Sequence, residues 1–264
     1  MTPSTEASGA ALIHSERDGA VLHLRLNRPA KRNAVNDALV LMLENLVTRL
    51  DPEVRCVVLS GEGQHFCAGL DLSELAECSV IDGVLHSRMW HAALDKLQFA
   101  PVPVVAVLHG AVVGGGLEIA AAAHIRVAER SAYYGLPEGQ RGLFVGGGGS
   151  MRLPRLIGAA RMADMMLTGR VLDADEGQQA GLTHYLVDAG AGLRKGFELA
   201  HKICGNAPLS NFAVIQALPR IAELAPSEAL FVESLVAAIA QADPAAKQRM
   251  RAFLDGRAAK VARS

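Results

Sequence analysis

The first half of the chain alternates short apolar runs with amphipathic segments. Residues 21–27 place apolar and polar side chains in turn, which predicts a strand paired in a hairpin with residues 11–14. Asn36 precedes a segment with leucines and valines on one helical face, so we expect it to cap a helix. Four further apolar runs predict strands: 54–60, 102–108, 125–128 and 132–134. This alternation predicts an α/β fold with a parallel sheet.

Helical patterns dominate the second half, which one predicted strand at 183–187 interrupts. The predicted helices span 150–157, 160–167, 173–180, 191–204, 209–223, 227–241 and 244–253. We expect the late helices to form an appendage that packs on the core or on a neighbouring subunit. Residues 73–98 show weak periodicity around His86, Trp90 and His91, and we expect them to form a lid or a pocket wall.

The composition excludes several classes of protein. With 264 residues, 50% of them hydrophobic, the chain is long enough for one large domain with its own core. A net charge of −1 gives no global attraction to nucleic acid or to a membrane. The longest apolar stretch, 102–128, is interrupted by proline, glycine and charged residues, unlike a membrane span. The basic stretch 247–263 is either a solvated helix face or a site for phosphate groups.

Cysteine usage and the N-terminal residues indicate a cytoplasmic protein. The cysteines are Cys56, Cys67, Cys78 and Cys204. They form no C-x-x-C pair and no histidine cluster accompanies them, so we expect no metal site. Free thiols suit a reducing compartment. Residues 1–10 are small and polar, which indicates a disordered tail rather than a secretory signal.

A glycine-rich turn joins an expected strand to an expected helix at residues 108–118. The start of a helix exposes free N–H groups and the positive end of the dipole, and glycines let another group approach the backbone closely. Both properties suit a developing oxyanion. Glu118 lies three residues after Gly115, so we expect its carboxylate on the same side. Taken alone, the segment is explained more simply by packing glycines and a glutamate that the dipole favours.

Two further glycine-containing turns carry residues that suit chemistry. Residues 61–72 follow an expected strand and lead toward a helix, with Asp71 as a candidate cap. Glu138 follows Pro137 in a rigid turn that would fix its direction. Each turn alone is more typical of an ordinary connection or a surface loop.

Together these segments resemble the crotonase (enoyl-CoA hydratase/isomerase) superfamily. The resemblance rests on the order and spacing of motifs between about residue 21 and about residue 260. The main motifs are 66–72 (FCAGLDL), 110–118, Pro137-Glu138 and 152–158 (RLPRLIG), with further matches at 27–29, 33–34, 167–170 and 180–182.

The family resemblance implies a crotonase-like fold, which is a spiral of β-β-α units with a helical C-terminal region. The expected organisation is a disordered tail (1–10), a catalytic core (11–200) and a helical oligomerisation region (201–264). The resemblance also implies a homotrimer, or a hexamer made of two trimers. It does not by itself fix the reaction, because this fold hosts several.

By motif position, the resemblance implies an oxyanion hole formed by the backbone N–H groups of Leu70 and Gly115. It would hold a thioester oxygen as that oxygen gains enolate character. Glu118 and Glu138 match the two glutamates of the family's hydratases. The implied reaction adds water across the 2,3 double bond of a 2-enoyl-CoA, with Glu118 activating the water and Glu138 protonating C2. The product would be a 3-hydroxyacyl-CoA, and the reaction would need neither a metal nor a redox cofactor.

The remaining implied site residues would contact the acyl-CoA substrate, whose CoA part is the handle. They are Arg28, Lys31, Ala68, Asp71, Leu72, Gly114, Phe253 and Lys260. The chain departs from the family after Glu138, where Gln140 and Arg141 replace a more apolar stretch. We expect these two residues to reshape the acyl pocket.

Several alternatives stay open. An enoyl-CoA isomerase, or a hydratase of an unusual acyl-CoA, would use the same site. A non-catalytic acyl-CoA-binding protein would share the fold, although neither glutamate is missing. A nucleotide-phosphate site at 146–150 is disfavoured, because no Gly-Lys-Ser/Thr sequence ends it. His65, His109 and His124 are unclustered, and they suit structural roles better than metal or base chemistry.

Overall fold

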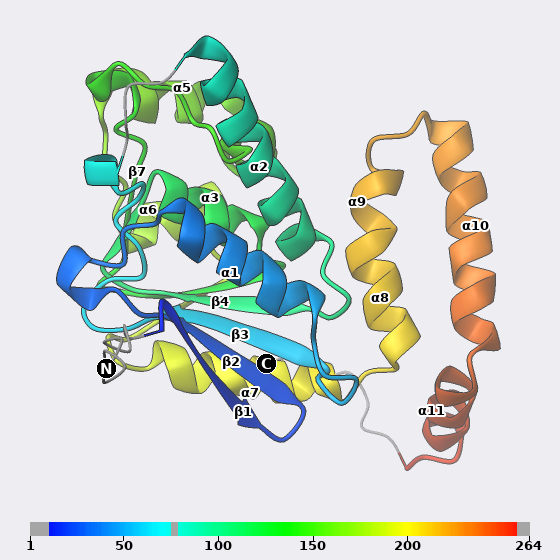
Figure 1. Cartoon of the computed structure of the whole chain (residues 1–264). Coiled ribbons are helices and arrows are strands. Elements are labelled where there is room, and N and C mark those ends of the chain that lie inside the picture. The colour runs from blue at the N-terminus through cyan, green and yellow to red at the C-terminus, as the bar shows by residue number, and fades with distance from the viewer. Residues whose placement is uncertain (1–10, 75–78, 258–264) are drawn as a thin grey trace, which may run out of the picture.

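The computed structural model describes residues 11–74 and 79–257 (Figure 1). The expected tail at 1–10 and the expected substrate contact Lys260 lie outside the described residues.

A six-stranded sheet forms the centre of the described part of the chain, in the order β1-β2-β3-β4-β6-β8. Its strands are β1 Ile13–Asp18, β2 Val21–Leu26, β3 Cys56–Gly61, β4 Val104–Leu108, β6 Ile125–Glu129 and β8 Tyr185–Val187. β1 and β2 form the predicted antiparallel hairpin. The other neighbours in this sheet pair in parallel, which confirms the predicted α/β class.

Helices cover both faces of the sheet (Figure 1). They are α1 Asp37–Thr48, α2 Val80–Gln98 and α3 Gly115–Ala122 on one face and α7 Gly192–Cys204 on the other. In β3, Val57 and Leu59 belong to the core with the first three helices, whereas Cys56 and Val58 belong to the core with α7. The strand therefore reads as a continuous apolar run because both of its faces are buried.

A second, two-stranded sheet replaces part of the turn that was expected at 110–116. β5 (Ala111–Val113) pairs in parallel with β7 (Tyr133–Gly135). The expectation of a plain turn was incomplete, because the partner strand lies about twenty residues further along the chain. The N–H of Gly114 then donates to the carbonyl of Gly135 at 2.9 Å. This bond ties the start of α3 to the segment that leads to Glu138.

α2 occupies most of the segment whose periodicity was weak. Ser79 and Asp82 form a capping box at its start. Its first turns expose their apolar side chains, and its later turns bury theirs. The exposed ones are Val80, Ile81, Val84 and Leu85, and the buried ones are Trp90, Ala93, Leu94 and Leu97. The change of environment along one helix explains the weak pattern.

The other helices follow their predicted positions closely. They are α4 Gly149–Ile157, α5 Ala159–Thr168, α6 Ala174–Ala180, α8 Pro208–Gln216, α9 Leu218–Ile221, α10 Pro226–Ala242 and α11 Pro244–Leu254. The predicted helix 209–223 is in fact two, α8 and α9. The break precedes Pro219, which lacks an N–H for the helical ladder. The described part of the chain also contains three short 3₁₀ turns: η1 Pro29–Lys31, η2 Leu72–Glu74 and η3 Gly139–Arg141.

The helices α8–α11 stand apart from the sheet (Figure 1). In the described residues, no single helix is long and apolar enough to cross a membrane. Among the described helices, only α10 and α11 taken together pass that test of length and composition, and a bend of 75° separates them.

Candidate active site

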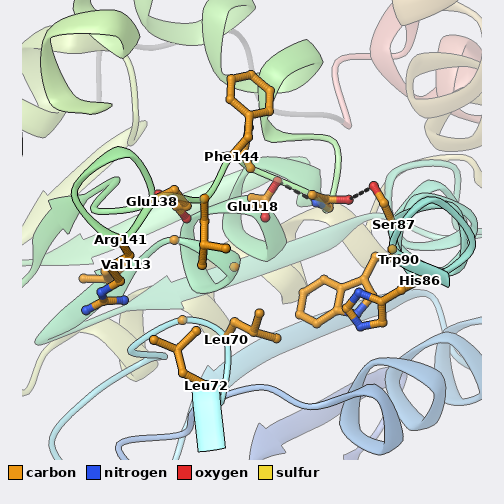
Figure 2. A pocket seen from close by; sticks show the side chains of 18 of the residues that line it. Leu70, Leu72, His86, Ser87, Trp90, Val113, Glu118, Glu138, Arg141 and Phe144 are labelled. Atoms are coloured by element: carbon orange, nitrogen blue, oxygen red, sulfur yellow. Dashed lines mark hydrogen bonds between the residues drawn. The ribbon is translucent and has the colours of Figure 1, made fainter. Parts of the chain in front are cut away.

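A pocket with a volume of about 340 Å³ lies over the start of α3 (Figure 2). Its walls come from the loop 68–72, from α2, from the start of α3 and from residues 138–147. Seven of the predicted site residues line it: Ala68, Leu70, Leu72, Gly114, Gly115, Glu118 and Glu138. Figure 2 shows the two glutamates side by side, with Leu70 and Leu72 below them and Phe144 above.

The backbone nitrogens of Leu70 and Gly115 border the same space. Gly115 opens α3, where the first N–H groups have no partner inside the helix. The loop before Leu70 is held by a 2.8 Å bond from the Val35 N–H to the Gly69 carbonyl. A Cβ atom on Gly69 would lie 3.8 Å from the Gly115 nitrogen, so the two segments approach closely. Within residues 11–74 and 79–257, neither the Leu70 N–H nor the Gly115 N–H donates to another backbone group. Two free donors at one place suit a developing oxyanion.

Gly114 lets Glu138 reach this space. Its backbone has φ 50° and ψ −121°, a region that only glycine adopts readily. A Cβ atom there would lie 2.6 Å from Glu138 Oε1. Any side chain at position 114 would therefore push the Glu138 carboxyl group away.

Glu118 is buried in the first turn of α3, with 3% of its surface exposed. Its Oε1 accepts hydrogen bonds from the N–H groups of Gly147 at 2.9 Å and Gly149 at 2.7 Å. Burial raises the pKa of Glu118, while these two N–H groups, the positive charge of Arg152 and the nearby His91 oppose the rise. Oε1 is thus fixed by the backbone, and Oε2 remains to face a reactant.

Glu138 lies at the end of the turn after β7 and has no comparable support. Its Oε2 is buried without a hydrogen-bond partner in the described part of the chain. Burial raises the pKa of Glu138 and the negative charge of Glu118 raises it further, while the residue's own backbone N–H and the positive charge of Arg141 oppose the rise. Two neighbouring carboxyl groups in such surroundings share one proton, since ionising both is costly. Glu138, whose Oε2 has no donor within the described residues and whose pKa the charge of Glu118 raises, is the better place for that proton.

Asp71 forms ion pairs with Arg28 and Lys31, two basic residues that were predicted to contact the substrate. Its Oδ2 accepts from Arg28 Nη2 and from Lys31 Nζ, both at 2.8 Å. These contacts fix the loop that carries Leu70, and hydrogen bonds from Lys31, Ser73 and Arg28 lower the pKa of Asp71. Arg28, Lys31 and Asp71 are absent from the residues lining the described pocket. Their contact with CoA stays a prediction.

Phe253 lies away from this pocket. It is 55% exposed on α11 and is not among the lining residues of the described chain. α11 lies below α10, among the helices that stand apart from the sheet and from α3 (Figure 1). Within one subunit, Phe253 therefore does not contact the pocket.

Trp90 belongs to the segment that was expected to form a pocket wall, and it does line the pocket, whereas the contacts of Ser87 and Arg152 with residues 146–147 were not predicted. Trp90, on α2, donates from Nε1 to Asp37 at 3.0 Å. Ser87, one turn earlier, donates to the Gly146 carbonyl at 2.7 Å. Arg152 donates from Nη1 to the Gly147 carbonyl at 3.0 Å. The His86–Trp90 cluster was a signal for the wall, but no local pattern pointed to the contacts with residues 146–147.

The two residues that depart from the family's pattern behave differently. Arg141 lines the pocket (Figure 2). Gln140 is not among the lining residues, and its Nε2 donates to the Thr168 carbonyl at 3.3 Å. Only Arg141 is therefore placed to shape this pocket.

His65, His109 and His124 form hydrogen bonds with the backbone, which fits the expected structural roles. His65 Nδ1 accepts from the Ala111 N–H at 3.1 Å. His124 Nδ1 accepts from the Val104 N–H at 2.9 Å, and burial lowers the pKa of His124 to about 4. His109 bonds the Gly63 carbonyl through Nε2 at 3.1 Å. Nowhere in the described residues do three or more His, Cys, Asp or Glu side chains form a group that could hold a metal ion.

Comparison with known proteins gives consistent matches over almost the whole chain. Residues 16–262 match the family described as Enoyl-CoA hydratase/isomerase. The enoyl-CoA hydratase EchA19 of Mycobacterium tuberculosis is 32% identical, and the match covers 97% of each chain. The 2,3-dehydroadipyl-CoA hydratase of Escherichia coli is 34% identical over 91% of this chain and 94% of that relative. A solved structure from Rhodopseudomonas palustris CGA009, provisionally titled enoyl-CoA hydratase, is 55% identical with a TM-score of 0.91, covering 96% of this chain and 98% of that one.

Proposed function

This chain belongs to the enoyl-CoA hydratase/isomerase family, and from that membership we propose that it is an enoyl-CoA hydratase. It adds water across the 2,3 double bond of a 2-enoyl-CoA to give a 3-hydroxyacyl-CoA. The observation that carries the proposal is the pair Glu118 and Glu138, which face one pocket beside two free backbone N–H groups. Relatives named as hydratases support it.

The proposed mechanism begins with the thioester oxygen between the N–H groups of Leu70 and Gly115. As water attacks C3, the electrons of the double bond move toward the carbonyl, and the oxygen gains enolate character. The two N–H groups stabilise that charge, and each is worth roughly 3–4 kcal/mol in comparable sites. They act without rearranging, because α3 and the Val35 contact already hold the backbone in place.

Glu118 and Glu138 divide the proton transfers in this proposal. Ionised Glu118 accepts a proton from the water whose oxygen bonds to C3. Protonated Glu138 gives its proton to C2, which completes the addition of H and OH. The donors around Glu118 Oε1 favour its ionised form, and the lack of donors at Glu138 Oε2 favours its neutral form. After product release, the proton passes from Glu118 to Glu138 to restore the starting state.

We propose that the active form is a homo-oligomer built through the C-terminal helices. α10 leaves large apolar side chains exposed in the isolated chain: Leu230, Phe231, Leu235 and Ile239. Exposed apolar side chains concentrated on one helix mark an interaction surface. A trimer, or two stacked trimers, fits the family. Phe253 would then reach CoA from a neighbouring subunit, since it lies away from the pocket of its own chain.

We also propose what the enzyme needs as a cofactor, how it holds CoA and where it is located. Neither a metal nor a redox cofactor is needed, because backbone donors and two carboxyl groups supply the chemistry above. CoA serves as the handle, with Arg28 and Lys31 near its phosphate groups. The proposed location is the cytoplasm, where thiols such as Cys56 and Cys67 remain reduced.

The test is the identity of the product formed from a 2-enoyl-CoA in water enriched in ¹⁸O. We expect a 3-hydroxyacyl-CoA that carries one ¹⁸O atom, detected by mass spectrometry. A shifted double bond without incorporated oxygen would instead indicate an isomerase. Binding without any product, across acyl chains of several lengths, would indicate a non-catalytic acyl-CoA-binding protein.

A further inference from the structure

Residues 146–149 hold Glu118, and they are held in turn by side chains from other elements. The segment consists of four glycines, so it has no side chains of its own to fix its conformation. A Cβ atom on Gly147 would lie 3.1 Å from Glu118 Oε2, and one on Gly149 would lie 2.7 Å from Oε1. The close approach requires glycine, so rigidity must come from outside the segment.

Arg152 provides that rigidity from the first turns of α4. Its side chain is buried, with a relative exposure of 3%, and every part of its guanidinium group is engaged. Nη1 donates to the Gly147 carbonyl at 3.0 Å. Nε donates to Gln98 Oε1 at 2.6 Å, and Nη2 donates to Asp95 Oδ1 at 2.5 Å. A planar fork of donors suits three fixed acceptors in a way that a lysine ammonium does not.

The hydrogen bonds of Arg152 connect α2 to Glu118 by way of Gly147, which uses its carbonyl on one side and its N–H on the other. Asp95 and Gln98 belong to the last turns of α2, the helix that forms the pocket wall. The carbonyl of Gly147 accepts from Arg152, and the N–H of Gly147 donates to Glu118. Ser87, also on α2, adds a bond to the Gly146 carbonyl at 2.7 Å. The position of Glu118 Oε1 thus depends on Arg152 although the two side chains form no ion pair in the described structure.

We propose that Arg152 is a positioning residue for the hydration step, which holds residues 147–149 so that Glu118 stays fixed and ionised. This inference rests on the proposed function of Glu118 as the group that activates water. Arg152 acts in two ways: through the Gly147 peptide it orients two N–H donors, and its charge favours a carboxylate nearby. Neither effect requires contact between Arg152 and the substrate.

The charged groups around Glu118 set the direction of the expected effect. Arg152 from α4 and His91 from α2 favour the ionised form of Glu118, and the charge of Glu118 in turn raises the pKa of Glu138. For Arg152 itself, the negative charge of Asp95 raises the pKa and the positive charge of Arg155 lowers it. Glu118 works as a base, so activity falls as the pH drops through its pKa. Removing Arg152 raises that pKa, and the acidic limb of the kcat profile moves to higher pH.

The direct test is the pKa of the Glu118 carboxyl group, measured by NMR on protein with ¹³C-labelled glutamate side chains. The resonance is assigned by its absence in Glu118→Gln. We expect Arg152→Met to raise this pKa by roughly one unit, as for a carboxylate that loses a nearby cation. Arg152→Lys keeps the charge but loses the fork, so the pKa rises less while kcat falls roughly 10- to 100-fold with little change in KM.

Arg155→Met is the matched control, because Arg155 lies one turn further along α4 and pairs with Glu223 at 2.9 Å on the surface. It should change neither the pKa of Glu118 nor kcat. An unchanged Glu118 pKa in Arg152→Met, or a loss of kcat that is equal at all pH values, would leave Arg152 a structural residue and overturn the proposal. The titration needs no turnover, so a failure of hydration itself is seen separately, in the wild-type product.

A second variant covers the case in which Arg152→Met does not fold. Gln98→Met keeps Arg152 and removes only the acceptor of its Nε–H. We expect a smaller rise of the Glu118 pKa in the same direction. If Gln98→Met folds and leaves that pKa unchanged, the proposed coupling from α2 to Glu118 is wrong.

Discussion

A single short turn places two neighbouring side chains, Gln140 and Arg141, in different surroundings. η3 begins directly after Glu138 and is only three residues long. Within it, Arg141 faces the pocket while Gln140 bonds the Thr168 carbonyl outside it. The sequence marked both residues as a departure from the family. It did not separate them, because a 3₁₀ turn of this length leaves no periodic pattern.

Arg141 is expected to set the upper pH limit of activity. In the proposed mechanism Glu138 gives its proton to C2, so activity is expected to fall as the pH rises through the pKa of Glu138. The positive charge of Arg141 lowers that pKa. Arg141→Met should therefore move the basic limb of the kcat profile to higher pH, by a fraction of a unit to about one unit because Arg141 is exposed.

Gln140→Met serves as the control for this change, since it alters the adjacent residue outside the pocket. Its pH profile should match that of the wild type. A basic limb that stays in place, or that moves to lower pH, in Arg141→Met would show that Arg141 does not act on Glu138.

At the scale of elements, locally signalled features were predictable. Asn36 caps α1 by accepting from the Leu39 N–H, as its position before an amphipathic segment indicated. The hairpin β1–β2 was likewise visible from its alternation. β5 and α2 were not assigned. β5 is three residues long and is held by pairing with distant segments, β7 and Cys67, and α2 lacks a constant apolar face.

The proposed homo-oligomer can be tested by changing an exposed apolar residue of α10. Phe231 on α10 is 65% exposed in the isolated chain, within the apolar set described above. Phe231→Asp would place a charge in the proposed interface, so we expect a smaller mass by size-exclusion chromatography with light scattering. Gln241→Asp adds the same charge to an exposed polar position on the same helix, and it should leave the mass unchanged. A wild-type monomer, or an unchanged mass for Phe231→Asp, would count against assembly through α10.

At the scale of the whole molecule, the site is assembled from segments far apart in the sequence. The loop before Leu70, the start of α3, the turn at Glu138 and residues 146–149 meet at one pocket. The sequence identified the first three, because each has a motif whose order and spacing fit a family. It missed the support of Glu118 by residues 147–149, since that contact joins positions 29 and 31 residues apart and leaves no local signature.

The two glutamates line the same pocket but have different surroundings. Glu118 has two backbone donors and a cation nearby, and Glu138 has a buried oxygen without a partner in the described residues. Because of that asymmetry, we assign Glu118 as the proton acceptor and Glu138 as the proton donor. This assignment requires that neither glutamate alone sustains hydration.

The most direct measurement is the loss of absorbance of the conjugated thioester when a 2-enoyl-CoA is hydrated, compared among Glu118→Gln, Glu138→Gln and a control. Glu129→Gln is the control, because Glu129 also accepts from two glycine N–H groups, Gly190 at 2.8 Å and Gly192 at 3.0 Å, but does not line the pocket. We expect each of the first two variants to lose roughly 10²- to 10⁴-fold in kcat, while the control keeps wild-type turnover. Normal turnover in either Glu118→Gln or Glu138→Gln would contradict the assignment of the two glutamates.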